Sequence, residues 1–129
     1  MKTILLSVFI TLLSFSTGLA QSGNSWLKKN YAAQGDWSIE TKDGQTYLVL
    51  ADNFKTKKGP DLKLFLTKKS SASIGKNEAV QKHGTFIANL RSNNGGQSYR
   101  LPAGVNPSDF KSLVIHCEKY TKVWASSNL

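Results

Sequence analysis

The side chains with the most reactive groups in this chain are one cysteine and two histidines. Cys117 is the only cysteine among 129 residues, and His116 stands directly before it in the stretch SLVIHCEKYTKVW, residues 112–124. The second histidine, His83, is followed by a glycine well upstream of that stretch. A lone thiol has no partner for an intramolecular disulfide. Cys117 is therefore either an inert core thiol, a redox-active thiol or the ligand of a prosthetic group.

The alternation of residue types around Cys117 separates it from His116. The stretch has the pattern of a β-strand, in which successive side chains point to opposite faces. Leu113 and Ile115 share the apolar face with Cys117, whereas His116 points to the opposite face. We therefore expect Cys117 to be buried and His116 to be a half-exposed strand residue. The two side chains are not expected to bind the same metal ion.

Several cofactor and catalytic chemistries have no motif in this sequence. There is no C-x-x-C-H motif for covalent haem attachment and no C-x-x-C dithiol for disulfide exchange. The only methionine is Met1, so a methionine haem ligand is excluded after residue 20. Two histidines and one cysteine cannot build a four-ligand zinc site without carboxylates, and we predict no metal site. No constellation typical of a hydrolase is visible either.

The first twenty residues have the pattern of a secretory signal peptide. Lys2 gives a short positive start, an apolar run covers residues 4–15, and small Gly18 and Ala20 precede the expected cut. The run is short for a transmembrane helix. No cysteine stands at the cut to accept a lipid. We expect residues 1–20 to be cleaved, no membrane anchor to be retained, and the mature protein to be periplasmic or secreted.

The charge balance is basic but dispersed along the chain. The formal net charge is +9, and it falls to +8 when Lys2 leaves with the signal peptide. The lysines cluster in or beside expected turns, and only two arginines occur, Arg91 and Arg100. Arginine is the usual reader of base edges. This distribution favours a solvated basic surface that faces acidic envelope components, and it argues against a nucleic-acid partner.

Short alternating segments predict an all-β fold, an antiparallel sandwich or a barrel-like single domain. Residues 21–34 form a lead-in, and residues 35–129 form the domain. Asp43-Gly44 marks a two-residue hairpin, Asn106-Pro107 starts one helical turn, and residues 67–83 form an irregular excursion. Expected strands lie in DWSIETK, TYLVLADNF, LKLFL, GTFIANL, QSYRLP, KSLVIHCE and TKVWA, with Phe86, Ala88 and Leu90 on one face of GTFIANL.

An ordered set of motifs resembles the DM13 domain family, also called the electron-transfer DM13 domain. The motifs are the DG turn, LVLADNFKT, GPDLKLFL, a G-x-F, GGQSYRLP, SDFKSLVIHCEKY and the closing WASSNL. Together they cover most of the chain after residue 20. The resemblance implies a β-sandwich-like domain whose redox role centres on the cysteine of the late strand, here Cys117. The family usually has tryptophan immediately before that cysteine, where this chain has His116.

The resemblance leaves two functions open. In the first, the exported domain transfers electrons through Cys117 to a redox partner that the sequence does not identify. The cysteine acts there as a bare thiol or as a haem ligand, and His83 is the candidate for the second axial position. In the second, the domain is a non-catalytic extracytoplasmic binding or adhesion module, and Cys117 is an inert core thiol. In both cases we expect the protein to be a monomer. We also expect it to transfer electrons or bind a partner rather than to act as a turnover enzyme.

Overall fold

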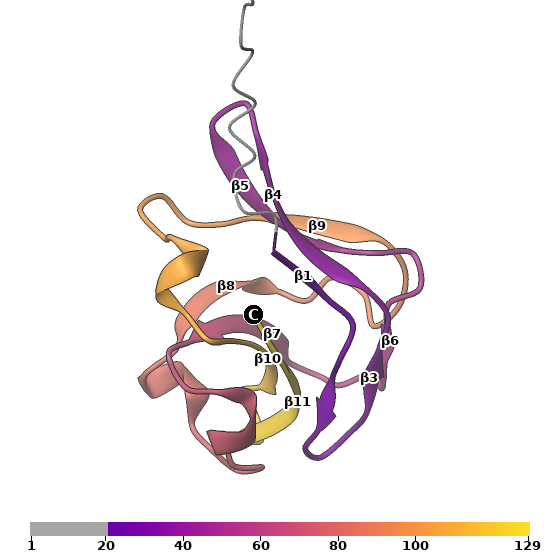
Figure 1. The fold of residues 1–129 in the computed structure, drawn as a ribbon. Helices are drawn as coiled ribbons and strands as arrows, with labels where there is room; N and C mark the ends of the chain where they lie inside the picture. The colour runs from indigo at the N-terminus through magenta and orange to yellow at the C-terminus, as the bar shows by residue number, and fades with distance from the viewer. Residues whose placement is uncertain (1–20) are drawn as a thin grey trace, which may run out of the picture.

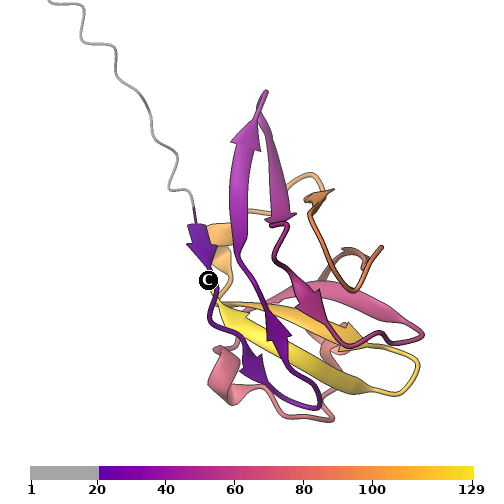
Figure 2. The same cartoon turned by 90° about the vertical axis from the view of Figure 1, so that its right-hand side faces the viewer.

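The computed structural model describes residues 21–129, and it places two antiparallel sheets face to face (Figures 1 and 2). Sheet A has the order β1 (Gln21–Gly23), β4 (Trp37–Lys42), β5 (Gln45–Leu50) and β9 (Gln97–Arg100). Sheet B has the order β2 (Leu27–Lys28), β11 (Lys122–Asn128), β10 (Ser112–Cys117), β7 (Leu62–Thr67) and β8 (Thr85–Asn89). A small third sheet pairs β3 (Ala33–Gln34) with β6 (Lys55–Thr56). The predicted all-β antiparallel architecture is confirmed, as a sandwich.

The predicted signal peptide, residues 1–20, lies outside the described residues. The lead-in predicted at residues 21–34 holds three short strands, β1, β2 and β3, one in each of the three sheets. Within the described part of the chain, no helix has the length and apolarity needed to cross a membrane.

Two of the predicted turns have the backbone geometry that their residues favour. Asp43 and Gly44 join β4 to β5 with positive φ angles of 51° and 74°, as a tight hairpin requires. This hairpin projects from the body of the sandwich (Figure 2). A short 3₁₀ helix, η3 (Pro107–Asp109), begins after Asn106, whose side chain accepts a hydrogen bond from the Ser108 N–H. Both turn predictions are confirmed.

The main hydrophobic core, called here the inner core, fills the space between the two sheets. The inward positions of the paired strands alternate with outward ones, so each strand contributes every second side chain. Sheet A supplies Trp37, Ile39, Leu48, Leu50 and Tyr99, and sheet B supplies Leu62, Leu64, Leu66, Ile87, Leu113, Ile115, Cys117 and Trp124.

A second, smaller core lies on the opposite face of sheet B and is called here the outer core. It consists of Phe65, Val114 and Val123 from the sheet and Ile74 and Val80 from the segment between β7 and β8. That segment carries two short 3₁₀ helices, η1 (Ser71–Ser73) and η2 (Val80–Lys82). The excursion predicted at residues 67–83 is therefore irregular, as expected. It also covers the sheet face that the sequence left open to solvent.

The prediction that Phe86, Ala88 and Leu90 share one face of the segment around β8 was wrong for Phe86 only, since Ala88 and Leu90 both pack against the inner core. Phe86 is 46% exposed and stacks edge-on against Phe65, with their ring centroids 5.7 Å apart. The pairing of β7 with β8 shifts register between Leu64 and Phe65, and this shift leaves Ile87 as an extra residue. The bulge interrupts the alternation, so Ile87 joins the inner core beside Ala88, and Phe86 lies on the outer face.

Candidate functional site

Cys117 lies in the inner core at the end of β10. Its exposed fraction is 0%, and its register partners are Leu62 of β7 and Lys122 of β11. Cys117 is the last residue of β10, and its two partners are the first residues of their strands. The buried thiol therefore lies directly before a turn. The predicted burial of Cys117 on the Leu113 and Ile115 face is confirmed.

Polar contacts on the neighbouring residues hold this end of sheet B closed. The Glu118 N–H donates to the Asp61 carbonyl over 3.2 Å, which ties the residue after Cys117 to the residue before β7. The Lys63 ammonium donates a hydrogen bond to the Glu118 carboxylate and lies 3.7 Å from Asp61. The hydrogen bond from Lys63 to Glu118 raises the pKa of Lys63. These contacts lie at or near the surface, so each is weak by itself.

His116 occupies the opposite face of the same strand, within reach of the outer core. Its ring meets Phe65 edge-on with a centroid separation of 5.8 Å, and its Nε2 lies 3.1 Å from the Glu78 carbonyl oxygen. Its exposed fraction is 0%, so the predicted half-exposed position was wrong. The physical reason is the excursion between β7 and β8, which lies over this face and buries a residue that strand parity alone leaves in solvent.

The surroundings of His116 favour the neutral imidazole. Nδ1 is buried and has no hydrogen-bond partner among the described residues, while Nε2 donates to the Glu78 carbonyl. Burial lowers the pKa of His116, and this effect outweighs the Glu78 hydrogen bond and the nearby carboxylates of Glu118 and Asp61, which act in the opposite direction.

Strand β10 keeps its two faces separate although a bulge lies beside it. The pairing of β10 with β11 shifts between Ile115 and His116, and the extra residue is Trp124 of β11. The pairing of β10 with β7 is regular from Ser112 to Cys117. The side-chain alternation of β10 is therefore intact, and the sulfur and the imidazole lie on opposite sides of the sheet.

His83 lies at the end of η2, in the excursion that covers the outer core. Its Nε2 is 2.8 Å from Glu78 Oε2, and the Lys69 ammonium is 2.9 Å from Glu78 Oε1. Burial by itself raises the pKa of Glu78, but the hydrogen bonds from Lys69 and His83 outweigh it and lower the pKa. His83 and Cys117 therefore belong to different sides of sheet B, and the structure does not bring them together.

The residues around Cys117 do not fit a haem. An iron bound to the sulfur would need space on the inner face of β10, which the side chains of the inner core occupy, and the thiol is 0% exposed. His83, the candidate second ligand, is on the other side of the sheet. Within residues 21–129, no group of three or more histidine, cysteine, aspartate or glutamate side chains is arranged to hold a metal ion.

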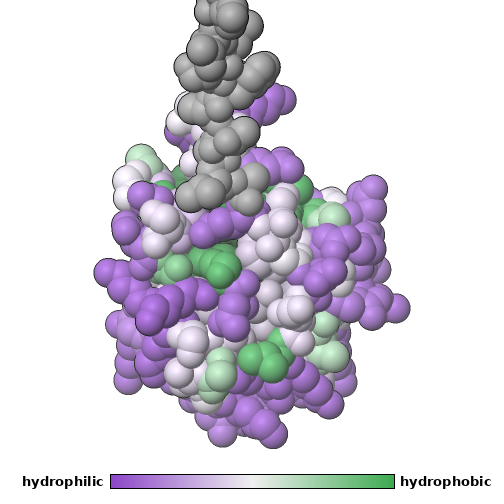
Figure 3. All heavy atoms as spheres, viewed as in Figure 1, coloured by the Kyte–Doolittle hydropathy of each residue, from purple (hydrophilic) through white to green (hydrophobic). Residues whose placement is uncertain are grey.

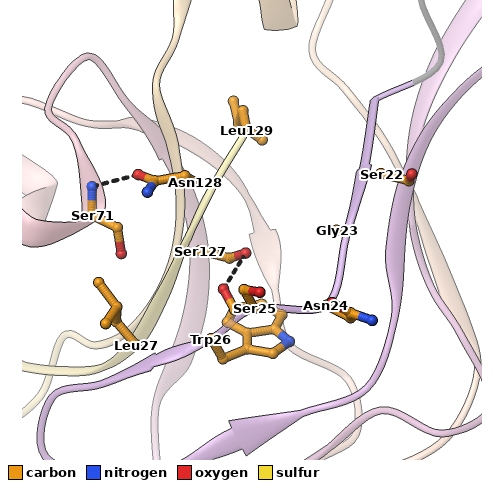
Figure 4. Close-up of a pocket in the computed structure, with 10 residues that line it drawn as sticks. All are labelled: Ser22, Gly23, Asn24, Ser25, Trp26, Leu27, Ser71, Ser127, Asn128 and Leu129. Atoms are coloured by element: carbon orange, nitrogen blue, oxygen red, sulfur yellow. Dashed lines mark hydrogen bonds between the residues drawn. The ribbon is translucent and has the colours of Figure 1, made fainter.

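Hydrophilic side chains cover most of the face seen in Figure 3, and hydrophobic groups appear there only in small separate areas. One hollow of about 510 Å³ lies where the two ends of the described chain meet, between Ser22 and Leu129 (Figure 4). Several polar groups that line this hollow form hydrogen bonds with one another. The Ser127 hydroxyl donates to the Ser25 carbonyl, and the Ser71 N–H donates to the Asn128 side chain. Cys117 does not line this hollow.

A second hollow, of about 400 Å³, lies at the end of sheet B that contains Cys117. We call it the lysine-aromatic pocket, and the residues used below are Tyr31, Lys57, Lys58, Tyr120, Lys122 and Trp124. Sequence reasoning did not identify this site. The one feature of the sequence that pointed to this pocket was the Lys57-Lys58-Gly59-Pro60 turn. The aromatic residues beside that turn come from distant parts of the chain.

The comparisons with known proteins identify a family for this chain. The sequence profile of the family described as electron transfer DM13 matches residues 25–129, which is most of the chain. No curated protein and no solved structure matches it. The matched range includes every strand except β1, and it contains Cys117 and the lysine-aromatic pocket. The chain belongs to the electron-transfer DM13 family.

Proposed function

We propose that this protein is exported and transfers electrons outside the cytoplasm, with Cys117 as its redox group and without a prosthetic group. Membership of the electron-transfer DM13 family supports the redox role in general terms. The pattern of residues 1–20 supports export. The lone thiol is the one side chain in residues 21–129 with ready two-electron chemistry.

The position of Cys117 at the end of a strand carries this proposal. Strand ends fray more readily than strand centres, because fewer buried contacts must break. Opening of the turn at residues 118–121 separates Cys117 from Lys122. The polar contacts that resist this opening include the Lys63 contacts with Glu118 and Asp61, and the backbone hydrogen bonds from Glu118 to Asp61 and from Thr121 to Glu118. The Lys122 ammonium also donates to Asn77. The thiol is thus closed off in the native state and becomes reactive through a local motion.

The chemistry of the open state is thiol–disulfide exchange. The Cys117 thiol releases its proton to water, and the thiolate attacks one sulfur of a partner's disulfide. A new S–S bond forms, and the second partner sulfur leaves as a thiolate. A donor dithiol then displaces the remaining partner sulfur, forms a mixed disulfide with Cys117 and closes to its own disulfide. Two electrons have passed from donor to partner, and Cys117 is a thiol again.

The test uses the mature protein, residues 21–129, and 5,5′-dithiobis(2-nitrobenzoate) as a model disulfide. We expect one thiol to react, at least about a hundredfold more slowly in buffer than in urea, because a local opening costs a few kcal/mol. Lys63→Gln removes contacts that hold the strand end, and we expect it to raise the native rate about threefold. Lys69→Gln is the matched control. It removes a similar contact at Glu78, on the other face of sheet B, and should leave the rate unchanged.

The dependence of the native rate on low urea concentration separates the two functions. Local opening exposes little surface, so the rate should depend only weakly on urea. A rate that follows global unfolding, and is insensitive to Lys63→Gln, would show that Cys117 is an inert core thiol. That result would favour the non-catalytic binding module. Export is checked by the intact mass of the secreted protein, which should begin at Gln21.

A further inference from the structure

Three distant segments build the lysine-aromatic pocket. Tyr31 follows β2, Lys57 and Lys58 follow β6, and Lys122 and Trp124 belong to β11. The Tyr31 and Trp124 rings are in contact, with centroids 4.4 Å apart and planes tilted by 48°. They form an aromatic wall at one side of the hollow, in which Tyr31 presents most of the accessible surface because Trp124 is only 4% exposed.

The pocket carries positive charge with no negative charge to balance it. Lys57, Lys58 and Lys122 line it, and no aspartate or glutamate is among its lining residues. Within residues 21–129, none of these three lysines forms a salt bridge. The Lys122 ammonium donates to the Asn77 side chain over 2.8 Å, so Lys57 and Lys58 supply the uncommitted charge of the pocket. The Lys57 ammonium lies over the Tyr31 ring, 4.6 Å from the centroid, and this cation–π contact holds it at the aromatic wall.

The wall is fixed in place before any ligand arrives. The Trp124 Nε1–H donates to the Lys57 carbonyl over 2.8 Å, so the indole and the lysine turn are joined directly. Gly59 lies so close to the indole that a Cβ there would meet Trp124 Cζ2 at 2.8 Å. Asn30 also lines the pocket, and its side chain donates to the carbonyls of Lys76 and Val123. A fixed wall reduces the entropy lost when a ligand binds.

Tyr120 adds an exposed aromatic ring beside this fixed wall. It lines the pocket, and 56% of it is exposed, so its ring is free to lie over a bound molecule. The hollow of about 400 Å³ is within the usual range for small-molecule sites. A flat aromatic ring fits between such side chains, because aromatic rings stack in offset or tilted arrangements.

We propose that the lysine-aromatic pocket binds a small planar organic anion, an aromatic carboxylate or sulfonate. Its ring lies against the Tyr31 and Trp124 wall, under Tyr120. Its acidic group lies at the ammonium groups of Lys57 and Lys58, and Lys122 adds positive charge nearby. This inference goes beyond the electron-transfer role and does not depend on Cys117, which does not line the pocket. Binding should therefore be the same in Cys117→Ala.

The test is titration of the ¹⁵N-labelled mature protein with naphthalene-2-sulfonate, followed by amide and indole N–H chemical shifts. We expect saturable shifts at residues 57–59 and 120–122 and at the Trp124 indole. Lys57→Gln/Lys58→Gln should weaken binding by at least about fivefold, because two unpaired charges near the sulfonate are lost. Naphthalene-2-sulfonamide, which has the ring without the charge, and methanesulfonate, which has the charge without a ring, should both bind more weakly.

The matched control is Lys42→Gln/Lys68→Gln, which removes the same charge from exposed positions outside the pocket. Equal weakening in this control would show that overall charge, and not the pocket, attracts the anion. Equal affinity for methanesulfonate would show a simple anion site. Absence of saturable shifts, or binding of a sulfated polysaccharide alone, would also overturn the proposal. Loss of binding in Cys117→Ala would show that anion binding depends on the thiol, against the proposal.

Discussion

Cys117 and His116 are consecutive residues of β10, yet their side chains lie on opposite sides of sheet B. The sulfur belongs to the inner core between the two sheets, and the imidazole faces Phe65 and the excursion that carries η1 and η2. Both are 0% exposed, because both faces of this sheet are covered. The thiol and the imidazole of this strand are therefore separated by the sheet, and a substitution of one side chain leaves the surroundings of the other in place.

The buried His116 should make the protein less stable in mild acid. Its folded-state pKa is lowered by burial, so the unfolded chain binds a proton more readily than the native one. This contribution to stability is complete above the unfolded pKa of about 6.5 and is lost as pH falls from there toward the folded pKa. We expect the free energy of unfolding in urea to decrease between pH 7.5 and pH 5.5.

The control for this pH dependence is His116→Phe, which keeps a ring against Phe65 and removes the titrating group. The Glu78 carbonyl keeps a partner in this variant, because the Val80 N–H also donates to it. We expect the decrease in this pH range to become smaller. An unchanged pH profile in His116→Phe would assign the acid sensitivity to other groups.

The close approach of Gly59 to Trp124 should make this glycine hard to replace. A Cβ at Gly59 would lie 2.8 Å from Trp124 Cζ2 and 2.9 Å from Leu62 Cδ2, so Gly59→Ala must displace an indole fixed by a hydrogen bond. We expect a loss of about 1–3 kcal/mol in the free energy of unfolding. The matched control is Gly75→Ala, since a Cβ there meets nothing within 4 Å. A loss as large in Gly75→Ala would contradict this account.

The turn after β10 contains a strained residue whose replacement should stabilise the protein. Thr121 has a φ of 50°, a region that β-branched residues rarely adopt. Thr121→Gly removes this strain but increases the freedom of the unfolded chain, so we expect a net gain of about 0.5–1 kcal/mol. Asp43, with a φ of 51°, is the comparison. Aspartate tolerates this region, so Asp43→Gly should gain less in the same urea titration.

The packing of Cys117 predicts which substitutions keep the fold. Cys117→Ala leaves only a small cavity in the inner core, and we expect it to cost about 1 kcal/mol. Cys117→Ser buries a hydroxyl in an apolar core, where an unpaired polar group costs about 1–3 kcal/mol. Chemical denaturation should therefore rank serine below alanine. Equal stability of the two variants would mean that the hydroxyl finds a partner or that the site admits water.

Local sequence determined the strands, the turns and the side of the sheet on which Cys117 lies. Side-chain alternation is a property of each strand, so Leu113, Ile115 and Cys117 could be assigned to one face without knowing the neighbours of β10. Asp43-Gly44 and Asn106 act within a few residues of themselves, and both turns have the expected geometry. The motifs that resemble the DM13 family are likewise read along the chain.

Only the tertiary structure decided what covers each face and which distant residues meet. A polar segment without a regular period gives no sign that two of its residues, Ile74 and Val80, anchor it over His116. The bulge at Ile87 depends on the pairing of β7 with β8, so the alternation in β8 alone could not reveal that Phe86 faces outward. The lysine-aromatic pocket joins Tyr31, Lys57 and Trp124, and contacts over such long sequence separations exist only once the sheets have paired.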